Sequence, residues 1–411
     1  MASASRRKAA GALLGALVLL LAPVGVPASA GTRADAPAEP RLAAEGDCRF
    51  PAPPLKGRPW ALQRVMLDQV WSKSTGKGVT VAVIDSGVDA TNKQLTPALG
   101  TQGADDFAPG TLGLVDENGH GTMAAGIIAA RQDADTGFVG LAPDAAILSI
   151  RQNGGTDTQK GNVDTLTRAV SYAVEHGADV INISQETSGP EGAAPGPALE
   201  SAIRYAIDVK DIVVVAAAGN SGDKDNFDTY PAKYDGVLAV GASDRNNDRT
   251  PFSQKKPYVG VLAPGVDMWS TVPRGGHCPG DGTSYASPYA AGVAALVRAV
   301  HPDWTARQVI TVIQQTAQRG QTGELEGSGW GVVDPLKAVT FAGVPGAVPV
   351  ETGVLPAQAP PVHVAPLTFG PTRNDRDRQT ATLVTGTALA ALLLLTTTAI
   401  VLRDARRRTH R

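Results

Sequence analysis

Residues 79–87 read VTVAVIDSG, and this stretch decides the fold. Positions 79–84 are an almost unbroken apolar run rich in β-branched residues, which is typical of a strand buried on both faces in a parallel sheet. Asp85 follows directly, so it is expected at the carboxyl end of that strand. In open α/β sheets this edge is where active sites form. An isolated aspartate in this setting would more often be a turn or capping residue.

Similar apolar runs recur along the chain and alternate with helical patterns. Strand–helix alternation predicts an α/β fold with a doubly wound parallel sheet and helices on both faces. The strands are expected at 79–84, 146–150, 180–183, 212–218 and 237–241, and the helices at 121–130, 163–176, 198–209, 283–300 and 305–316.

A histidine, His120, lies between two glycines in the stretch NGHGT at 118–122. The small residues at 123–130 predict a buried helix with His120 in its first turn. A lone histidine there usually caps or packs. The flanking glycines allow another segment of the chain to approach closely, which favours a functional role over capping or packing alone.

A serine, Ser284, stands in GTSYASP at 282–288, at the start of an Ala-rich helical stretch. A serine at a helix start is most often only an N-cap, although a nucleophile there also gains from the helix dipole. Together, Asp85, His120 and Ser284 supply a nucleophile, its base and the carboxylate that orients the base. Their order in the chain separates one group of serine hydrolases from others with the same triad.

These three motifs resemble those of the subtilisin-like serine proteases. A fourth match is AAGN at 217–220, which ends the expected strand 212–218. The resemblance implies that Asn220 donates its side-chain amide to the oxyanion, with the backbone N–H of Ser284 as the second donor. Alone, Gly-Asn-Ser-Gly at 219–222 would be read as a turn. The motif residues expected to support the site are Gly121, Thr122, Gly282 and Thr283.

The N-terminal end indicates export. A basic start at 5–8, an apolar run at 10–26 and Ala-Ser-Ala at 28–30 predict a signal peptide over residues 1–30, with cleavage after Ala30. A retained N-terminal anchor is the alternative, and the Ala-x-Ala site argues against it.

The C-terminal end predicts a membrane anchor. Residues 380–402 are uncharged and mostly apolar, and a bilayer-spanning helix takes roughly 20 residues. Arginines dominate the tail at 403–411, which predicts that this tail is cytoplasmic. Repeated prolines at 342–379 indicate a semi-rigid linker. A single-pass protein of the cell membrane is therefore expected, with the globular domain at 60–341 outside.

The composition limits the kinds of partner, metal and cofactor that the sequence indicates. A net charge of -2 gives no indication of a nucleic-acid partner. No spacing resembles a zinc site, so no metal or cofactor is assigned, and no compact loop of oxygen ligands is assigned to calcium, which subtilisins often bind. The two cysteines, Cys48 and Cys278, are compatible with one disulfide in an exported protein. Two separate thiols are the alternative.

The layout resembles one branch of the subtilisin-like proteases. The arm at 31–59 contains Cys48 and is too short and Pro-rich for a folding propeptide. Signal, arm, protease domain, linker and one C-terminal helix resemble the mycosins, membrane-anchored proteases associated with type VII secretion in actinobacteria. The resemblance implies an arm that leaves the site unblocked, polypeptide substrates and a membrane secretion complex as partner. A mainly structural role in that complex and a surface-tethered degradative protease are the alternatives.

One stretch departs from the subtilisin pattern. Subtilisins usually follow their central strand with Ser-Leu-Gly-Gly, which lines the substrate cleft, whereas the strand at 179–183 here runs into SQET at 184–187. The missing glycines argue against broad specificity. Glu186 either disfavours acidic substrate residues at the cleft or is a solvated loop charge. By motif order, residues 156–161 are expected at the other edge of the cleft.

Overall fold

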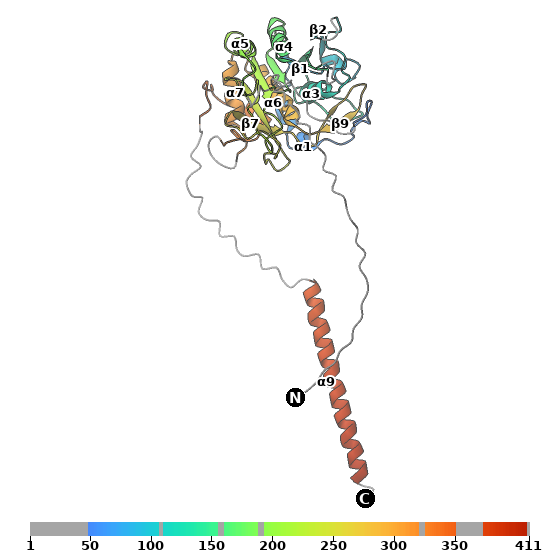
Figure 1. Ribbon diagram of the computed structural model, residues 1–411. Helices are drawn as coiled ribbons and strands as arrows, with labels where there is room; N and C mark the ends of the chain where they lie inside the picture. The colour runs from blue at the N-terminus through green and yellow to red at the C-terminus, as the bar shows by residue number, and fades with distance from the viewer. Residues whose placement is uncertain are drawn as a thin grey trace, which may run out of the picture. The chain divides into compact units, whose positions relative to one another are not determined.

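The computed structural model describes residues 48–106, 110–154, 160–187, 193–319, 325–350 and 373–408 (Figure 1). The chain divides into two units, one ending at Thr352 and the other spanning Gly353–Arg411. The predicted signal peptide at 1–30 lies outside the described residues, as do the arm before Cys48 and residues 351–372 of the linker predicted at 342–379. The last residues of that predicted linker, 373–379, are helical instead, as the start of α9 (Arg373–Arg408).

A seven-stranded sheet forms the centre of the first unit, in the order β2-β3-β1-β4-β5-β6-β7. Every neighbouring pair is parallel. The order reverses around β1, since the chain builds β2 and β3 on one side of it and β4 to β7 on the other. Ligand sites lie at the carboxyl ends of the strands at such a switch point. The strands are β1 Thr80–Asp85, β2 Leu99–Asp105, β3 Ala146–Arg151, β4 Val180–Ile183, β5 Val213–Ala217, β6 Leu238–Ser243 and β7 Val259–Pro264.

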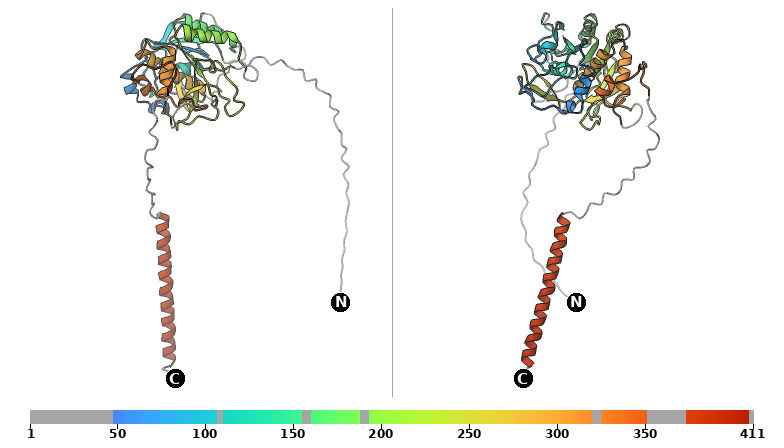
Figure 2. Two further views of the ribbon diagram at one scale, coloured as in Figure 1. Left: turned by 90° about the vertical axis from the view of Figure 1, so that its left-hand side faces the viewer. Right: turned by 180° about the vertical axis from the view of Figure 1, so that it is seen from behind.

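Helices cover both faces of this sheet. Alternate residues of β1 enter two different cores: Val81 and Val83 pack with α3, α6 and α7, whereas Ala82 and Ile84 pack with α4 and α5. Figures 1 and 2 show α4 and α5, drawn in green, together at one side of the body. Burial on both faces explains the unbroken apolar run of β1. The helices are α3 His120–Ala129, α4 Val163–Glu175, α5 Pro197–Arg204, α6 Thr283–Val300 and α7 Ala306–Gln315.

The longest helix of this unit, α6, is buried from Thr283 to Arg298 and packs against β4, β5, β6 and β7. Its many alanines let it lie close to the sheet, and Gly292 allows a close approach to Leu141 and to Ile128 of α3. The dense packing fixes its N-terminal end, and therefore Ser284, against the carboxyl edge of the strands.

The predicted strands and helices are confirmed to within two residues at most ends, but one predicted helix ends early and several further elements are present. The helix expected at 198–209 ends at Arg204 and continues as a π-helical turn, Tyr205–Val209. The structure adds β2, β7 and an antiparallel hairpin of β8 and β9, which were not predicted. The additional elements include β8 Met268–Thr271, β9 His277–Gly280, α1 Trp60–Gln63, α2 Leu67–Trp71, the 3₁₀ turn Thr96–Ala98 and α8 Pro335–Val339.

The second unit contains α9, Arg373–Arg408. This helix is longer than the apolar stretch expected at 380–402, because the charged residues on both sides of it continue the helix. Its segment Arg376–Arg403 is long and apolar enough to cross a membrane, judged by length and composition.

The described part of the arm, from Cys48 onward, is bound to the body. Cys48 forms a disulfide with Cys278 of β9, with a Cα–Cα distance of 6.0 Å and a sequence separation of 230. Ala52 N–H donates to the Gly275 carbonyl at 3.0 Å, next to the same hairpin. The arm therefore crosses the body beside the helix that begins at His120.

Candidate active site

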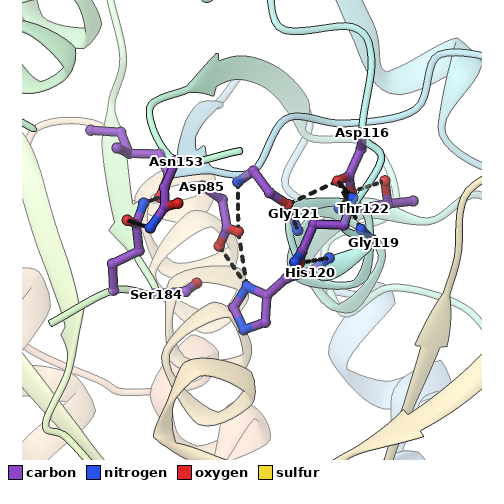
Figure 3. Close-up of polar contacts among 12 residues, drawn as sticks. Asp85, Asp116, Gly119, His120, Gly121, Thr122, Asn153 and Ser184 are labelled. Atoms are coloured by element: carbon purple, nitrogen blue, oxygen red, sulfur yellow. Dashed lines mark hydrogen bonds and ion pairs between the residues drawn. The ribbon is translucent and has the colours of Figure 1, made fainter. Parts of the chain in front are cut away.

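The first pair of candidate residues lies at the carboxyl edge of the sheet. Asp85 ends β1 and His120 begins α3. The ring Nδ1 of His120 lies 2.8 Å from Oδ1 and 3.0 Å from Oδ2 of Asp85 (Figure 3). Both side chains have 0% exposure. A carboxylate only accepts hydrogen bonds, so Nδ1 carries the proton and Nε2 is the basic nitrogen of the neutral ring.

Glycines allow α3 to begin this close to β1. A Cβ on Gly121 would lie 2.1 Å from the Gly87 carbonyl oxygen and 3.1 Å from the Cβ of Asp85. Gly119 has a φ of 96°, and a Cβ there would lie 2.3 Å from the ring of Phe50 in the arm. The two glycines around His120 therefore serve two different close approaches, one by β1 and one by the arm.

A second acidic residue, Asp116, holds this half of the site together, and the sequence did not reveal it. Its carboxylate accepts hydrogen bonds from three backbone N–H groups and two hydroxyls (Figure 3). The donors are Asn118 N at 3.1 Å, Gly119 N at 2.8 Å, Thr122 N at 2.9 Å, Thr122 Oγ1 at 2.6 Å and Ser86 Oγ at 2.9 Å.

Those bonds join the residue after Asp85 to the turn that carries His120. Burial raises the pKa of Asp116 to about 6, although the hydrogen bonds from Thr122, Gly119 and Ser86 act in the opposite direction. An aspartate shortly before a helix start often binds nearby N–H groups, and this was the one available sequence indication.

The candidate nucleophile, Ser284, is the second residue of α6 and has 1% exposure. The ring of the next residue, Tyr285, lies 5.1 Å from that of His120, so the start of α6 faces the start of α3. The Oγ of Ser284 has no hydrogen-bond partner among the described residues. Catalytic hydrogen bonds are often long in the absence of substrate and tighten when it binds.

Asn220 follows β5 and is tied to the same helix start. Its Oδ1 accepts from the N–H of Thr283 at 2.9 Å and from the Thr283 hydroxyl at 3.1 Å. A backbone N–H only donates, so the oxygen of the amide must face Thr283, and Nδ2 points to the other side. The side chain is half-buried.

The N-terminus of α6 adds a second donor. The first N–H groups of a helix have no acceptor within the helix, and the helix dipole makes this end positive. Thr283 N–H is used by Asn220, which leaves the N–H of Ser284 as the next donor along the helix. Asn220 is therefore bound to the helix start at which Ser284 lies.

The residues after β4 also lie at this edge. Gln185 Nε2 donates to the Ile84 carbonyl at 3.3 Å, and Asn153 Nδ2 donates to Gln185 Oε1 at 3.2 Å. Gln185 therefore ties together the ends of β1 and β3. Glu186 is half-buried, and its Oε2 is buried, so its carboxylate is only partly open to solvent. Most of the other expected edge, 156–161, lies outside the described residues.

Within the described ranges, no three or more His, Cys, Asp or Glu side chains gather as metal ligands would.

Comparisons with known proteins agree with this arrangement. Residues 76–331 match the model of the subtilase family. Mycosin-4 of Mycobacterium tuberculosis is 38% identical over 376 residues, covering 83% of this chain and 81% of the relative. Mycosin-1 of Mycolicibacterium smegmatis is 33% identical, with 88% of each covered.

The fold is also similar to solved mycosin structures. The MycP3 protease from the type VII (ESX-3) secretion system has a TM-score of 0.63 and 34% identity, covering 75% of this chain and 93% of that one. MycP1 with its N-terminal propeptide removed has a TM-score of 0.63 and 35% identity, covering 70% and 99%. The family match and these relatives show that the chain belongs to the subtilase family of serine proteases and, within it, to the mycosins.

Proposed function

We propose that this chain is a membrane-anchored endopeptidase that acts outside the cytoplasm through Asp85, His120 and Ser284. The observation that carries the proposal is the buried pair of His120 and Asp85, 2.8 Å apart, facing the helix start that bears Ser284. Asp85 keeps the proton on Nδ1, which leaves Nε2 as the base for a serine hydroxyl.

The proposed reaction is acyl transfer in two halves. His120 Nε2 takes the proton of Ser284 as its Oγ bonds to the peptide carbonyl carbon. The tetrahedral intermediate expels the amine, which receives that proton from His120, and leaves an ester on Ser284. Water then attacks the ester with His120 again as base. Asp85 stabilises the imidazolium formed in each half.

The oxyanion is assigned to Asn220 Nδ2 and the N–H of Ser284. Both groups lie at the start of α6, where Thr283 fixes the orientation of the amide. A donor in such a place is typically worth about 3 kcal/mol of the barrier, because it acts on charge that develops only in the transition state.

Fluorophosphonate labelling of the full-length protein tests this mechanism. We expect the label on Ser284, located by mass spectrometry, and loss of labelling in Asp85→Asn and His120→Ala. Peptide hydrolysis should fall at least about 10⁴-fold in Ser284→Ala. Hydrolysis near the wild-type rate by Ser284→Ala would refute the assignment.

The membrane topology is also a proposal. The apolar segment Arg376–Arg403, the arginine-rich tail at 403–411 and the N-terminal signal sequence support a catalytic domain outside and a tail inside. A cysteine placed in the tail should react with an impermeant maleimide only after the cells are permeabilised. Labelling in intact cells would reverse the orientation.

A role in type VII secretion is supported by the relatives, one of which is described as a protease from such a system. A mainly structural role in the secretion complex is the second candidate, and the near-complete burial of Ser284 favours it. Export that survives Ser284→Ala but fails on deletion of the protein would establish that second role. Loss of export in both strains would assign the role to proteolysis. Rapid hydrolysis of unfolded casein would instead favour a degradative protease.

A further inference from the structure

The reaction itself determines where one substrate side chain lies. If Asn220 holds the carbonyl oxygen, the Cα bonded to that carbonyl lies close to Asn220, and so does its side chain. Asn220 follows Gly219, and both extend from the end of β5. The residue before the scissile bond therefore places its side chain beside this segment.

Glu186 lies against that segment. A Cβ on Gly219 would be 2.2 Å from Glu186 Oε2, and 2.8 Å from atoms of Gln254 and Thr229. Gly219 has a φ of 108°, so both its conformation and its surroundings require glycine. The carboxylate thus packs directly on the backbone next to Asn220.

Backbone hydrogen bonds hold Glu186 in this place. Thr187 and Tyr230 exchange two of them, at 2.9 and 2.8 Å, which joins the chain after β4 to the segment after β5. Thr229 Oγ1 donates to the Ala218 carbonyl at 2.6 Å. Glu186 is therefore carried by a braced segment, with its Oε2 buried.

Three charged side chains and one tyrosine lie on the segments next to Glu186. Two lysines of the neighbouring segment, Lys233 and Lys256, both pair with Asp228. The hydroxyl of Tyr258 is hydrogen-bonded to Thr229. Burial raises the pKa of Tyr258, and the charge of Glu186 acts in the same direction, so the phenol stays neutral.

We propose that Glu186 makes this enzyme selective for lysine or arginine immediately before the scissile bond. The inference rests on the proposed function, since it uses Asn220 as the oxyanion donor. A cationic side chain in this place gains a charge-assisted hydrogen bond to a partly buried carboxylate. An acidic substrate residue would meet a like charge, so the glutamate peptide should be cleaved most slowly.

The opposite reading is steric. Glu186 stands where subtilisins usually carry glycine, so its side chain takes up volume that a large substrate residue would otherwise occupy. In that case alanine would be preferred to lysine. The two readings differ in charge dependence, because glutamine has nearly the same volume as glutamate and carries no charge.

A peptide series measured on the full-length enzyme separates them. The substrates differ only in the residue before the cleaved bond: lysine, arginine, norleucine, alanine or glutamate. We expect kcat/KM for lysine to exceed that for norleucine, its uncharged analogue, by about 10-fold or more. In Glu186→Gln that ratio should fall about 10-fold. The exposed Glu175→Gln serves as the matched control.

The outcomes distinguish the two proposals. An enzyme that cleaves the series but prefers alanine, or keeps its lysine-to-norleucine ratio in Glu186→Gln, overturns the role of Glu186 alone. An enzyme that cleaves none of the peptides and takes no fluorophosphonate label overturns the proposed function, and this inference with it. Unchanged fluorophosphonate labelling in Glu186→Gln shows that this variant is folded and its triad assembled.

Discussion

The two halves of the active site are built differently. In the half formed by β1 and α3, Asp85 and His120 have 0% exposure, Asp116 has 5%, and the arm covers Gly119. In the half formed by β5 and α6, the nucleophile Ser284 has 1% exposure but Asn220 remains half-exposed, as does Glu186 after β4. The base and its carboxylate are sealed, whereas the groups proposed to hold the carbonyl oxygen and the side chain of the substrate are accessible.

This difference separates two physical tasks. A histidine that must keep one tautomer benefits from a rigid, dry setting, because water would compete for Nδ1. A donor that must bind an oxygen arriving with the substrate has to stay open to it. Substitutions in the sealed half should therefore lower both activity and stability, whereas substitutions in the open half should lower activity alone.

The largest expected effect in this comparison comes from the open half. In Asn220→Ala we expect kcat to fall about 10²–10³-fold with little change in KM, because the lost hydrogen bond strengthens only in the transition state. The melting temperature should stay within about 2 °C of the wild type, since water replaces the half-exposed amide. Steady-state kinetics and calorimetry measure both, with the exposed Asn246→Ala as control. A large drop in melting temperature would remove the distinction between the halves.

A substitution in the sealed half should lower both stability and activity. In Asp116→Asn the new amide group turns a donor toward N–H groups that need an acceptor. We expect a loss of about 1–3 kcal/mol of stability and about a 10-fold lower kcat, because the turn carrying His120 loosens. Urea unfolding and peptide kinetics test this against the exposed Asp144→Asn. If the variant were more stable, the free-energy cost of burying the Asp116 carboxylate would exceed the gain from its five hydrogen bonds.

The smallest effect is expected at the anchor of the arm, and only on stability. Leu55 N–H donates to Nδ1 of His277 at 3.1 Å, so the proton of the neutral ring is on Nε2, which donates to Gln94 at 2.8 Å. Burial lowers the pKa of His277 to about 4, with the charge of Lys93 acting the same way and Asp133 opposing it. Below pH 6.5, the usual pKa of histidine, His277 binds a proton in the unfolded chain but stays neutral in the folded protein.

Stability should therefore decrease as the pH falls from 6.5 to about 4. Melting curves of the wild type and His277→Gln should diverge at high pH and converge as the pH falls through this window. Asp116 has a raised pKa, so its titration makes the folded protein more stable as the pH falls through the same range. Both proteins contain Asp116, so its contribution cancels when their stabilities are compared. A constant difference across the window would show that His277 does not titrate as its burial requires.

The predictable parts of the fold are those with a local cause. β1 and β4 were predicted because they are short, mostly apolar and rich in β-branched residues, and Asp85 because it follows the apolar run of β1. β2 reads LGTQGAD, with two glycines and polar residues, and it becomes a strand only because β3 pairs with it. The hairpin of β8 and β9 likewise has no alternating pattern, and it is held by α3 and the arm.

The site follows the same rule. Asp85, His120, Asn220 and Ser284 stand at the ends of elements whose positions the sequence predicts, so their proximity could be expected. The contact of Phe50 with Gly119 joins segments far apart in the chain, and no local pattern indicates it. The number of bonds that Asp116 accepts depends equally on the folded turn around it.

The disulfide gives the molecule a closed covalent loop. Cys48 and Cys278 are 230 residues apart in the sequence. Asp85, His120 and Asn220 lie inside the loop that they close, and Ser284 lies just outside it. A single cut anywhere between the two cysteines opens this loop but leaves both fragments in one molecule. A nicked enzyme should therefore run as the intact chain on a gel without reductant and separate into two bands with it. All of its site residues stay joined after a first nick, wherever in the loop that nick falls.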